Sequence, residues 1–189
     1  MSEQNNGKVK FFSKPPKGKM TTLFVVFLWI ILWNVIYQAL HHQLSELPIP
    51  IENWSFFICV TVFFMQEELS LMQRFWHTLV GGAVGLFLAC AVVGGCTLLA
   101  KAGLSSLLAV IIMLVITIGM LILLHPYCPM VFNNVGFIYF IVSLIDSSTT
   151  IEMLPSNLVS LATGSICLNL GVIGVLTILK TVKAKKASK

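Results

Sequence analysis

The sequence predicts an all-α integral membrane protein, with six transmembrane helices that form two inverted three-helix repeats and with two of the helices short. Three observations predict this fold class: the composition, a series of apolar runs and a similarity between the two halves of the chain. Hydrophobic residues make up 57% of the 189 residues and charged residues 10%, and the mean hydropathy is +0.93. Because a soluble domain carries about 25% charged residues, the expected partner of this apolar surface is the lipid bilayer.

Four apolar runs approach the length of about 20 residues that a membrane-spanning helix needs. They are Thr21–Leu40, Phe75–Ala100, Leu104–Leu124 and Asn157–Leu179. The first run is longer than the apolar core of a secretory signal peptide, and it ends in His41 and His42 without a cleavage site of small residues. We therefore expect it to remain as a membrane helix.

Two shorter runs lie between the long ones, at Asn53–Met65 and Met130–Ile145. Each is either a short tilted helix that crosses the membrane or a re-entrant segment. We favour six crossings, because backbone that is exposed to lipid without spanning leaves its polar groups unsatisfied. The charge distribution fits six crossings and four crossings equally well.

The basic residues are concentrated at the two ends of the chain. The end lysines are Lys8, Lys10, Lys14, Lys17, Lys19, Lys180, Lys183, Lys185, Lys186 and Lys189. The positive-inside rule places both ends in the cytoplasm, in a multi-pass protein of the inner (plasma) membrane. No basic stripe with interleaved aromatic residues is present, so we expect no nucleic-acid partner. The predicted layout is a basic segment (1–19), a six-helix domain (20–180, with repeats at 20–101 and 104–180) and a basic tail (181–189).

The two halves of the chain resemble each other when they are offset by 79 residues. This offset pairs Gly85 with Gly164, and an offset of 80 pairs Asn53 with Asn133. Three crossings in each repeat turn the second copy upside down, which is the plan of many secondary transporters. Because one six-helix unit encloses little volume, we also expect a homo-oligomer.

Short segments at matching places in two repeats indicate a transporter site, so the two short runs hold the candidate residues. We predict substrate binding by polar and aromatic side chains, namely Arg74, Asn133, Asn134, Thr61, Phe57, Phe137 and Tyr139. We predict proton coupling by Glu67, Glu68 and His77, because histidine and desolvated carboxyl groups titrate near neutral pH. The expected ligand is a small organic anion that Arg74 contacts.

Each of these residues also has a structural interpretation. The two asparagines can cap a helix that starts after Pro129. Arg74 can pair with a glutamate or anchor its helix at the headgroups, and His77 can lie at the membrane interface beside Trp76. The sequence leaves both interpretations open.

Metal, cofactor and enzyme sites have little support in the sequence. The five cysteines include no pair at metal-binding spacing, and we expect no metal and no cofactor. His125 and Cys128 share a loop, but no third group is placed to orient them, so we expect no enzyme.

A family resemblance adds to this interpretation. The run from Trp54 to Thr61, followed by Arg74 and then by spaced glycines at Gly81 and Gly85, resembles the fusaric acid resistance and aromatic acid exporter superfamily, and in particular its small single six-helix modules. The resemblance implies efflux of small, often aromatic, carboxylic acids driven by the proton gradient.

The expected function is therefore a small membrane transporter or exporter module that moves small organic acids with proton coupling. One alternative is the substrate-capture subunit of a vitamin-type importer, although such subunits dock a partner through small residues on the first helix, and Thr21–Leu40 has one late alanine. The other alternative is an intramembrane processing enzyme that uses His125 and Cys128.

Overall fold

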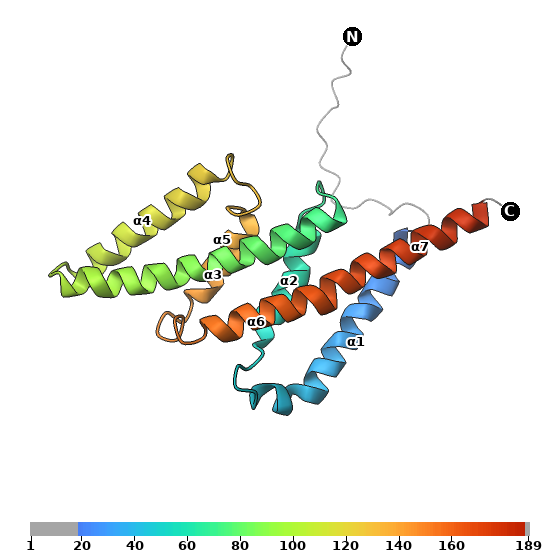
Figure 1. Ribbon diagram of the computed structural model, residues 1–189, viewed down its shortest axis with the longest axis horizontal. Coiled ribbons are helices and arrows are strands. Elements are labelled where there is room, and N and C mark those ends of the chain that lie inside the picture. The colour runs from blue at the N-terminus through green and yellow to red at the C-terminus, as the bar shows by residue number, and fades with distance from the viewer. Residues whose placement is uncertain (1–18, 188–189) are drawn as a thin grey trace, which may run out of the picture.

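The computed structural model describes residues 19–187, and within that range every regular element is a helix (Figure 1). The elements are α1 (Lys19–Ser45), α2 (Asn53–Met65), α3 (Leu71–Lys101), α4 (Ser106–Leu124), α5 (Asn134–Ser143), α6 (Leu154–Gly164), the π-helical turn η1 (Ser165–Leu170) and α7 (Gly171–Ala187). The last three follow one another without a break, so residues 19–187 form six helical segments. Most of the predicted basic segment at 1–19 and the end of the tail lie outside the described residues.

Local sequence explains where the long helices begin. Ser70 precedes α3 and forms a capping box, in which its side chain accepts a hydrogen bond from the Gln73 backbone while the Gln73 side chain accepts one from the Ser70 N–H. Ser105 caps α4 through the Leu108 N–H at 3.4 Å. Between these helices Gly103 has a φ of 94°, which glycine adopts without strain.

The central helices pack in two crossed pairs. Helix α5 packs along α3, while α2 packs along α6 and η1. Helix α3 also contacts α6, which joins the two pairs at the centre. Figure 1 shows α4 and α1 at opposite edges of this arrangement, with α4 against α3 and α1 against α7.

Two glycines mark where the outer helices dock. A methyl group at Gly95 of α3 would overlap the Met113 side chain of α4. A methyl group at Gly171, where α7 begins, would overlap the indole ring of Trp29 on α1. Each outer helix therefore approaches its long neighbour closely at a residue without a side chain.

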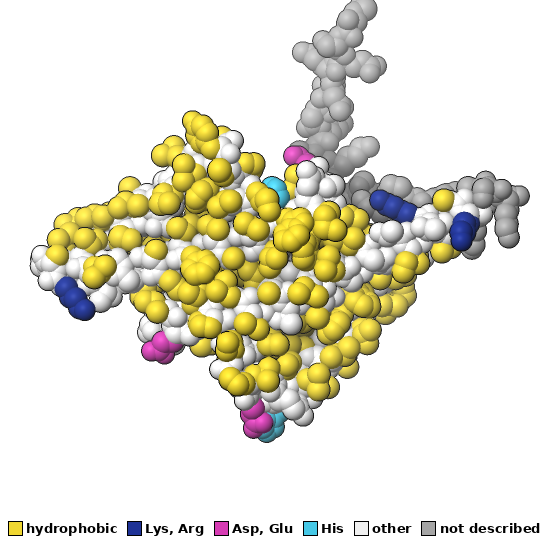
Figure 2. Space-filling model, in the orientation of Figure 1, with side chains coloured by type: hydrophobic (Ala, Val, Ile, Leu, Met, Phe, Trp, Pro, Cys, Tyr) yellow, Lys and Arg dark blue, Asp and Glu magenta, His cyan; other side chains and the backbone are white. Residues whose placement is uncertain are grey.

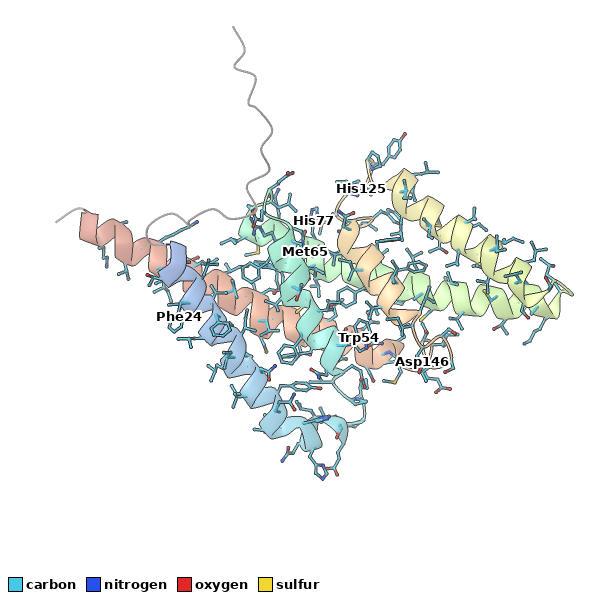
Figure 3. All side chains as sticks on the ribbon, turned by 180° about the vertical axis from the view of Figure 1, so that it is seen from behind. Phe24, Trp54, Met65, His77, His125 and Asp146 are labelled. Atoms are coloured by element: carbon cyan, nitrogen blue, oxygen red, sulfur yellow. The ribbon has the colours of Figure 1, made fainter. Side chains whose placement is uncertain are left out.

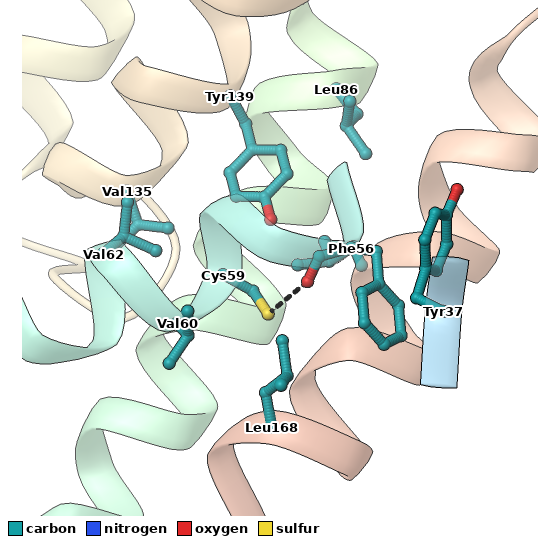
Figure 4. Close-up of a cluster of buried hydrophobic side chains, with 10 residues drawn as sticks. Tyr37, Phe56, Cys59, Val60, Val62, Leu86, Val135, Tyr139 and Leu168 are labelled. Carbon is teal, nitrogen blue, oxygen red and sulfur yellow. Dashed lines mark hydrogen bonds between the residues drawn. The ribbon is translucent and has the colours of Figure 1, made fainter. Parts of the chain in front are cut away.

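The main core cluster lies where the central helices meet, and Figure 4 shows it. Its buried members are Tyr37, Phe56, Cys59, Val60, Val62, Leu86, Val135, Tyr139, Leu161 and Leu168. They come from α1, α2, α3, α5, α6 and η1, so every segment except α4 and α7 contributes. Helix α4 joins the protein through a second cluster that includes Leu121 and Phe140.

Four helices of the described chain are long and apolar enough to cross a membrane. They comprise α1, α3, α4 and the continuous helix made by α6, η1 and α7. Figure 2 shows hydrophobic side chains over most of the visible face, with charged side chains at its edges. Large apolar side chains on α4 are exposed, for example Leu107 at 72% and Leu123 at 71%, and an apolar surface of this kind is one that lipid or another protein covers. The structure confirms an all-helical fold with two short helices, while the six membrane crossings and the inverted repeat stay predictions.

Candidate functional site

Two clefts open at opposite ends of the central helices. In Figure 3, Met65, His77 and His125 mark one end, and Trp54 and Asp146 mark the other. We call the first the His77 cleft and the second the Asp146 cleft. Each lies where one of the two short helices ends.

The His77 cleft has a volume of about 630 Å³. Its lining residues come from the end of α2, the start of α3, the loop after α4 and the start of α5; they are Met65, Gln66, Glu67, Glu68, Leu69, His77, His125, Pro129, Asn133, Asn134 and Val135. A smaller apolar pocket of about 310 Å³ adjoins it and is lined by Leu121, Ile122, Phe137 and the shared residues His125, Asn133 and Asn134. The structure thus brings together Glu67, Glu68, His77, Asn133 and Asn134, with Phe137 beside them.

A hydrogen bond between α2 and α3 lies at the base of the His77 cleft. The Gln66 side chain donates to the Thr78 hydroxyl at 3.1 Å and to the Val62 carbonyl at 3.0 Å. Thr78 is fully buried. Gln66 follows the last residue of α2, so its side chain both satisfies a terminal carbonyl and links α2 to the neighbouring helix.

Asn133 is occupied by structural hydrogen bonds. Its side-chain oxygen accepts from the Gly136 N–H at 2.9 Å, which caps α5, and its amide nitrogen donates to the carbonyls of His77 and Met130. The capping interpretation therefore describes Asn133. The neighbouring Asn134 is exposed in the cleft, and its side chain makes no hydrogen bond to the described part of the chain.

Arg74 holds the turn between α2 and α3. Its guanidinium donates to the Leu69 carbonyl at 2.8 Å and to the Glu67 carbonyl at 2.6 Å. Arg74 is not among the described residues that line either cleft. These two contacts bind the side chain to the backbone of Glu67 and Leu69, two residues that line the His77 cleft.

Three other predicted residues lie away from the His77 cleft. Thr61 is exposed on the outer side of α2. Phe57 packs against the rings of Tyr37 and Phe56, at 5.5 and 4.8 Å between centroids. Tyr139 is fully buried in the core cluster. The matching places of the two short segments directed the prediction to these helices, but they did not show which side of each helix faces the cleft.

The Asp146 cleft has a volume of about 330 Å³. It lies between the end of α5, the start of α6 and the start of α2, and it is lined by Trp54, Val142, Ser143, Ile145, Asp146, Thr149, Thr150, Met153 and Asn157. The Ser148 hydroxyl donates to the Asp146 carboxylate at 2.5 Å. Hydrogen bonds from Ser148 and then Thr149 lower the pKa of the Asp146 carboxyl, so this group stays ionised.

A chain of buried hydrogen bonds separates the Asp146 cleft from the core. The Tyr139 hydroxyl donates to the Ser55 carbonyl at 3.0 Å, and the Ser55 hydroxyl donates to the Asn157 carbonyl at 2.8 Å. These contacts join α5, α2 and α6. The two clefts therefore do not meet, and the core cluster lies between them.

The sequence contained a signal for the residues that the prediction missed. The offset of 80 that pairs Asn53 with Asn133 also pairs Gln66 with Asp146, and the offset of 79 pairs Thr78 with Asn157. Applying the repeat to the polar residues would have found both clefts.

The chemistry available in these clefts is polar and acidic. Within residues 19–187 no group of three His, Cys, Asp or Glu side chains is placed to hold a metal ion. No lysine or arginine is among the described residues that line either cleft, whereas Glu67, Glu68 and Asp146 do line them. The chain matches no known protein family, no curated protein and no solved structure.

Proposed function

We propose that this protein is a small membrane transport module in which a polar solute passes between the His77 cleft and the Asp146 cleft. The observation that carries the proposal is the pair of clefts at opposite ends of the central helices, each at the end of a short helix. A solute that enters one cleft must pass through the centre of the protein to reach the other. In this proposal, the hydrogen-bonded core between the clefts blocks that passage in the conformation described here.

Helix length supports hydrated clefts that reach into the membrane. Helix α2 has 13 residues and α5 has 10, so at 1.5 Å per residue they are about 20 and 15 Å long. The hydrocarbon core of a bilayer is about 30 Å thick. Each short helix must therefore end below the membrane surface, and non-helical backbone at that depth is tolerated only where protein buries it or a watery cavity lines it.

The close helix crossings support the inverted repeat. A methyl group at Gly85 of α3 would overlap the carbonyl oxygen of Gly136 on α5. A methyl group at Gly164 of α6 would overlap the carbonyl oxygen of Phe56 on α2. The offset of 79 relates the two glycines, and the offset of 80 relates Phe56 to Gly136. The α3–α5 crossing and the α6–α2 crossing are equivalent under the repeat, and each places a glycine against the carbonyl oxygen of a matching residue. A two-fold axis in the membrane plane requires this correspondence.

The clefts match under the same offsets. Met65 and Gln66 of the His77 cleft correspond to Ile145 and Asp146 of the Asp146 cleft. Each cleft also takes residues from the start of the other short helix, with Asn134 in one and the corresponding Trp54 in the other. In transporters built this way, exchange of conformation between the repeats opens the site to each side in turn.

The lining favours a neutral or cationic solute over the organic acid that the family resemblance implies. Three carboxylates line the clefts, and the Arg74 guanidinium is engaged by backbone carbonyls. His77 and His125 line the same cleft as Glu67 and Glu68. We propose that the two histidines carry the proton, because histidine titrates near neutral pH. We retain as proposals the inner-membrane location, the cytoplasmic termini and a homo-oligomer.

A flux assay tests the proposal. The purified protein is reconstituted in liposomes, and uptake of a radiolabelled benzoate, sugar alcohol and primary amine is compared with uptake by protein-free liposomes. We expect protein-dependent uptake that is greatest for the amine or the sugar alcohol. Replacing Gln66→Leu removes the polar link to Thr78 at the base of the cleft and is expected to reduce that uptake.

The matched control is Leu107→Val, a change on the outer surface of α4, which is expected to leave uptake unchanged. The transport proposal is rejected if no solute enters faster than in protein-free liposomes. It is also rejected if Gln66→Leu and Leu107→Val behave alike.

A further inference from the structure

The Asp146 cleft holds polar side chains that have no partner inside the protein. Asn157 is 5% exposed, and its side-chain oxygen is buried without a hydrogen bond. Ser143 is 8% exposed, and its hydroxyl is also without a partner in the described chain. Both residues line the cleft. A buried polar group without a partner costs about 1–3 kcal/mol. Rotation of either side chain toward the cleft would expose its oxygen to a ligand there, and no hydrogen bond of that oxygen within the described chain would be lost.

The other lining groups define the chemistry of that ligand. The Asp146 carboxylate provides the one formal charge among the lining residues of the described chain. Trp54 provides an aromatic ring, which is held against Tyr139 at 5.7 Å between centroids. A carboxylate, an amide oxygen, a hydroxyl and an indole ring together suit a group that is positively charged and has several N–H donors.

We propose that the Asp146 cleft binds a small primary amine in its ammonium form. The ammonium group donates one hydrogen bond to each of Asp146, Asn157 and Ser143, and the alkyl body of the amine lies against Trp54. The Asn157 side chain turns over so that its oxygen faces the ligand, because none of its amide hydrogens is committed within the described chain. As the substrate class of the transport module this assignment rests on the proposed function, but as a binding site it is testable without transport.

Two other ligand classes fit the cleft less well. A divalent metal ion such as Ca²⁺ takes six to eight oxygen ligands, commonly from several carboxylates, and only one carboxylate lines the cleft. A carboxylic acid would place its charge beside the ionised Asp146 with no basic residue among the described lining residues to compensate. The volume of about 330 Å³ is at the lower end of small-molecule sites, which favours an amine of a few carbon atoms.

Calorimetric titration of the purified protein in detergent tests the proposal. The probe is butylammonium. The comparison ligands are butyrate, which carries the opposite charge, and tetramethylammonium, which is a cation without N–H donors. We expect butylammonium to bind and the other two to bind at least about tenfold more weakly, because a charge-assisted hydrogen bond is lost in each case. Asp146→Asn and Asn157→Leu are each expected to weaken butylammonium binding about tenfold.

The control variant is Glu152→Gln, which removes an exposed carboxylate close to the cleft in the sequence that lines neither cleft, and it is expected to leave the titration unchanged. Because Asn157→Leu alters a buried site, the thermal unfolding of this variant is also measured. If it is unfolded, the test rests on Asp146→Asn, which changes an exposed loop residue. The proposal is overturned if butylammonium does not bind the wild-type protein, if butyrate binds as well, or if Asp146→Asn binds as the wild type does. Binding without flux in liposomes would reject the transport function and leave this site intact.

Discussion

At the scale of the residue, Arg74 was predicted to bind a ligand, but in the structure its charged side chain stabilises a turn. Its two hydrogen bonds go to backbone carbonyls of the turn between α2 and α3. We predict that Arg74→Ala lowers the free energy of unfolding by about 1–2 kcal/mol, because the turn loses charge-assisted hydrogen bonds. Thermal unfolding in detergent measures the change.

Lys101→Ala is the control for Arg74→Ala, because it removes an exposed cation at the other end of α3 and is expected to leave the unfolding temperature unchanged. Solute binding by Arg74→Ala is expected to match the wild type. An Arg74→Ala protein that is fully stable but has lost binding would restore the anion-contact hypothesis.

Asp146 permits a prediction about pH. Hydrogen bonds from Ser148 and Thr149 lower the pKa of its carboxyl below the ordinary value, so the carboxylate is charged throughout the range above that value. The amine ligand is protonated over the same range. We predict that the affinity for butylammonium is constant between about pH 5 and about pH 8, since an unperturbed carboxyl titrates near 3.9. Calorimetry across this range checks it, and a loss of affinity centred near pH 6 would assign the contact to a different group.

At the scale of the element, the glycines of α3 differ in what surrounds them. Gly85 meets a backbone carbonyl of α5, which cannot rotate away, whereas a methyl group at Gly94 would meet nothing within 4 Å in the described chain. We predict that Gly85→Ala destabilises the protein by about 1–3 kcal/mol through overpacking. The matched change Gly94→Ala should be neutral or slightly stabilising, because alanine is the better helix former.

The same test applies in the second half of the chain, where Gly164→Ala is expected to destabilise the protein and Gly174→Ala is expected to be tolerated. The unfolding temperatures of the four variants in detergent check both predictions. Equal effects at Gly85 and Gly94 would contradict the close crossing of α3 and α5.

The sequence was sufficient to predict the elements because apolar length is a local property. The run Asn53–Met65 became α2 with the same limits, and the long runs became long helices with ends that moved by a few residues. The sequence did not predict which side of each short helix faces a cleft, because that orientation depends on tertiary packing. Phe57 and Thr61 lie on α2 yet face away from the His77 cleft, since α6 and η1 cover one side of α2.

At the scale of the whole molecule, the proposed transport function requires the two clefts to open to opposite sides of a membrane. Cys128 is exposed in the loop between α4 and α5, and His125 and Pro129 of the same loop line the His77 cleft. We predict that a membrane-impermeant maleimide labels Cys128 in inside-out vesicles and not in intact cells. Asp146→Cys, made in a Cys128→Ser background, should show the reverse, and Cys128→Ser alone measures the labelling of the four remaining cysteines. Labelling of both positions from the same side would remove the transport proposal.

The site was partly predictable at this scale. The repeat directed attention to the two short helices, and five of the predicted residues do gather at one cleft. The second cleft was missed because its lining side chains come from α5, α6 and α2, which are far apart in the sequence. Only packing brings Ser143 and Asn157 together.

The docking of α1 against α7 has a mechanical consequence. Trp29 of α1 lies over Gly171, while Gly174, one turn further along α7, faces open space within the described chain. In the first half, the position equivalent to Gly174 is Gly95, and that glycine is the one that Met113 of α4 covers. Under the proposed inverted repeat, the two outer helices would therefore dock at positions that differ by about one helical turn, or about 5 Å. If each half adopts the conformation of the other during transport, α1 shifts by one helical turn along α7, so that Trp29 moves from Gly171 to Gly174. A shift of this kind occurs between two packed positions, with no stable position between them.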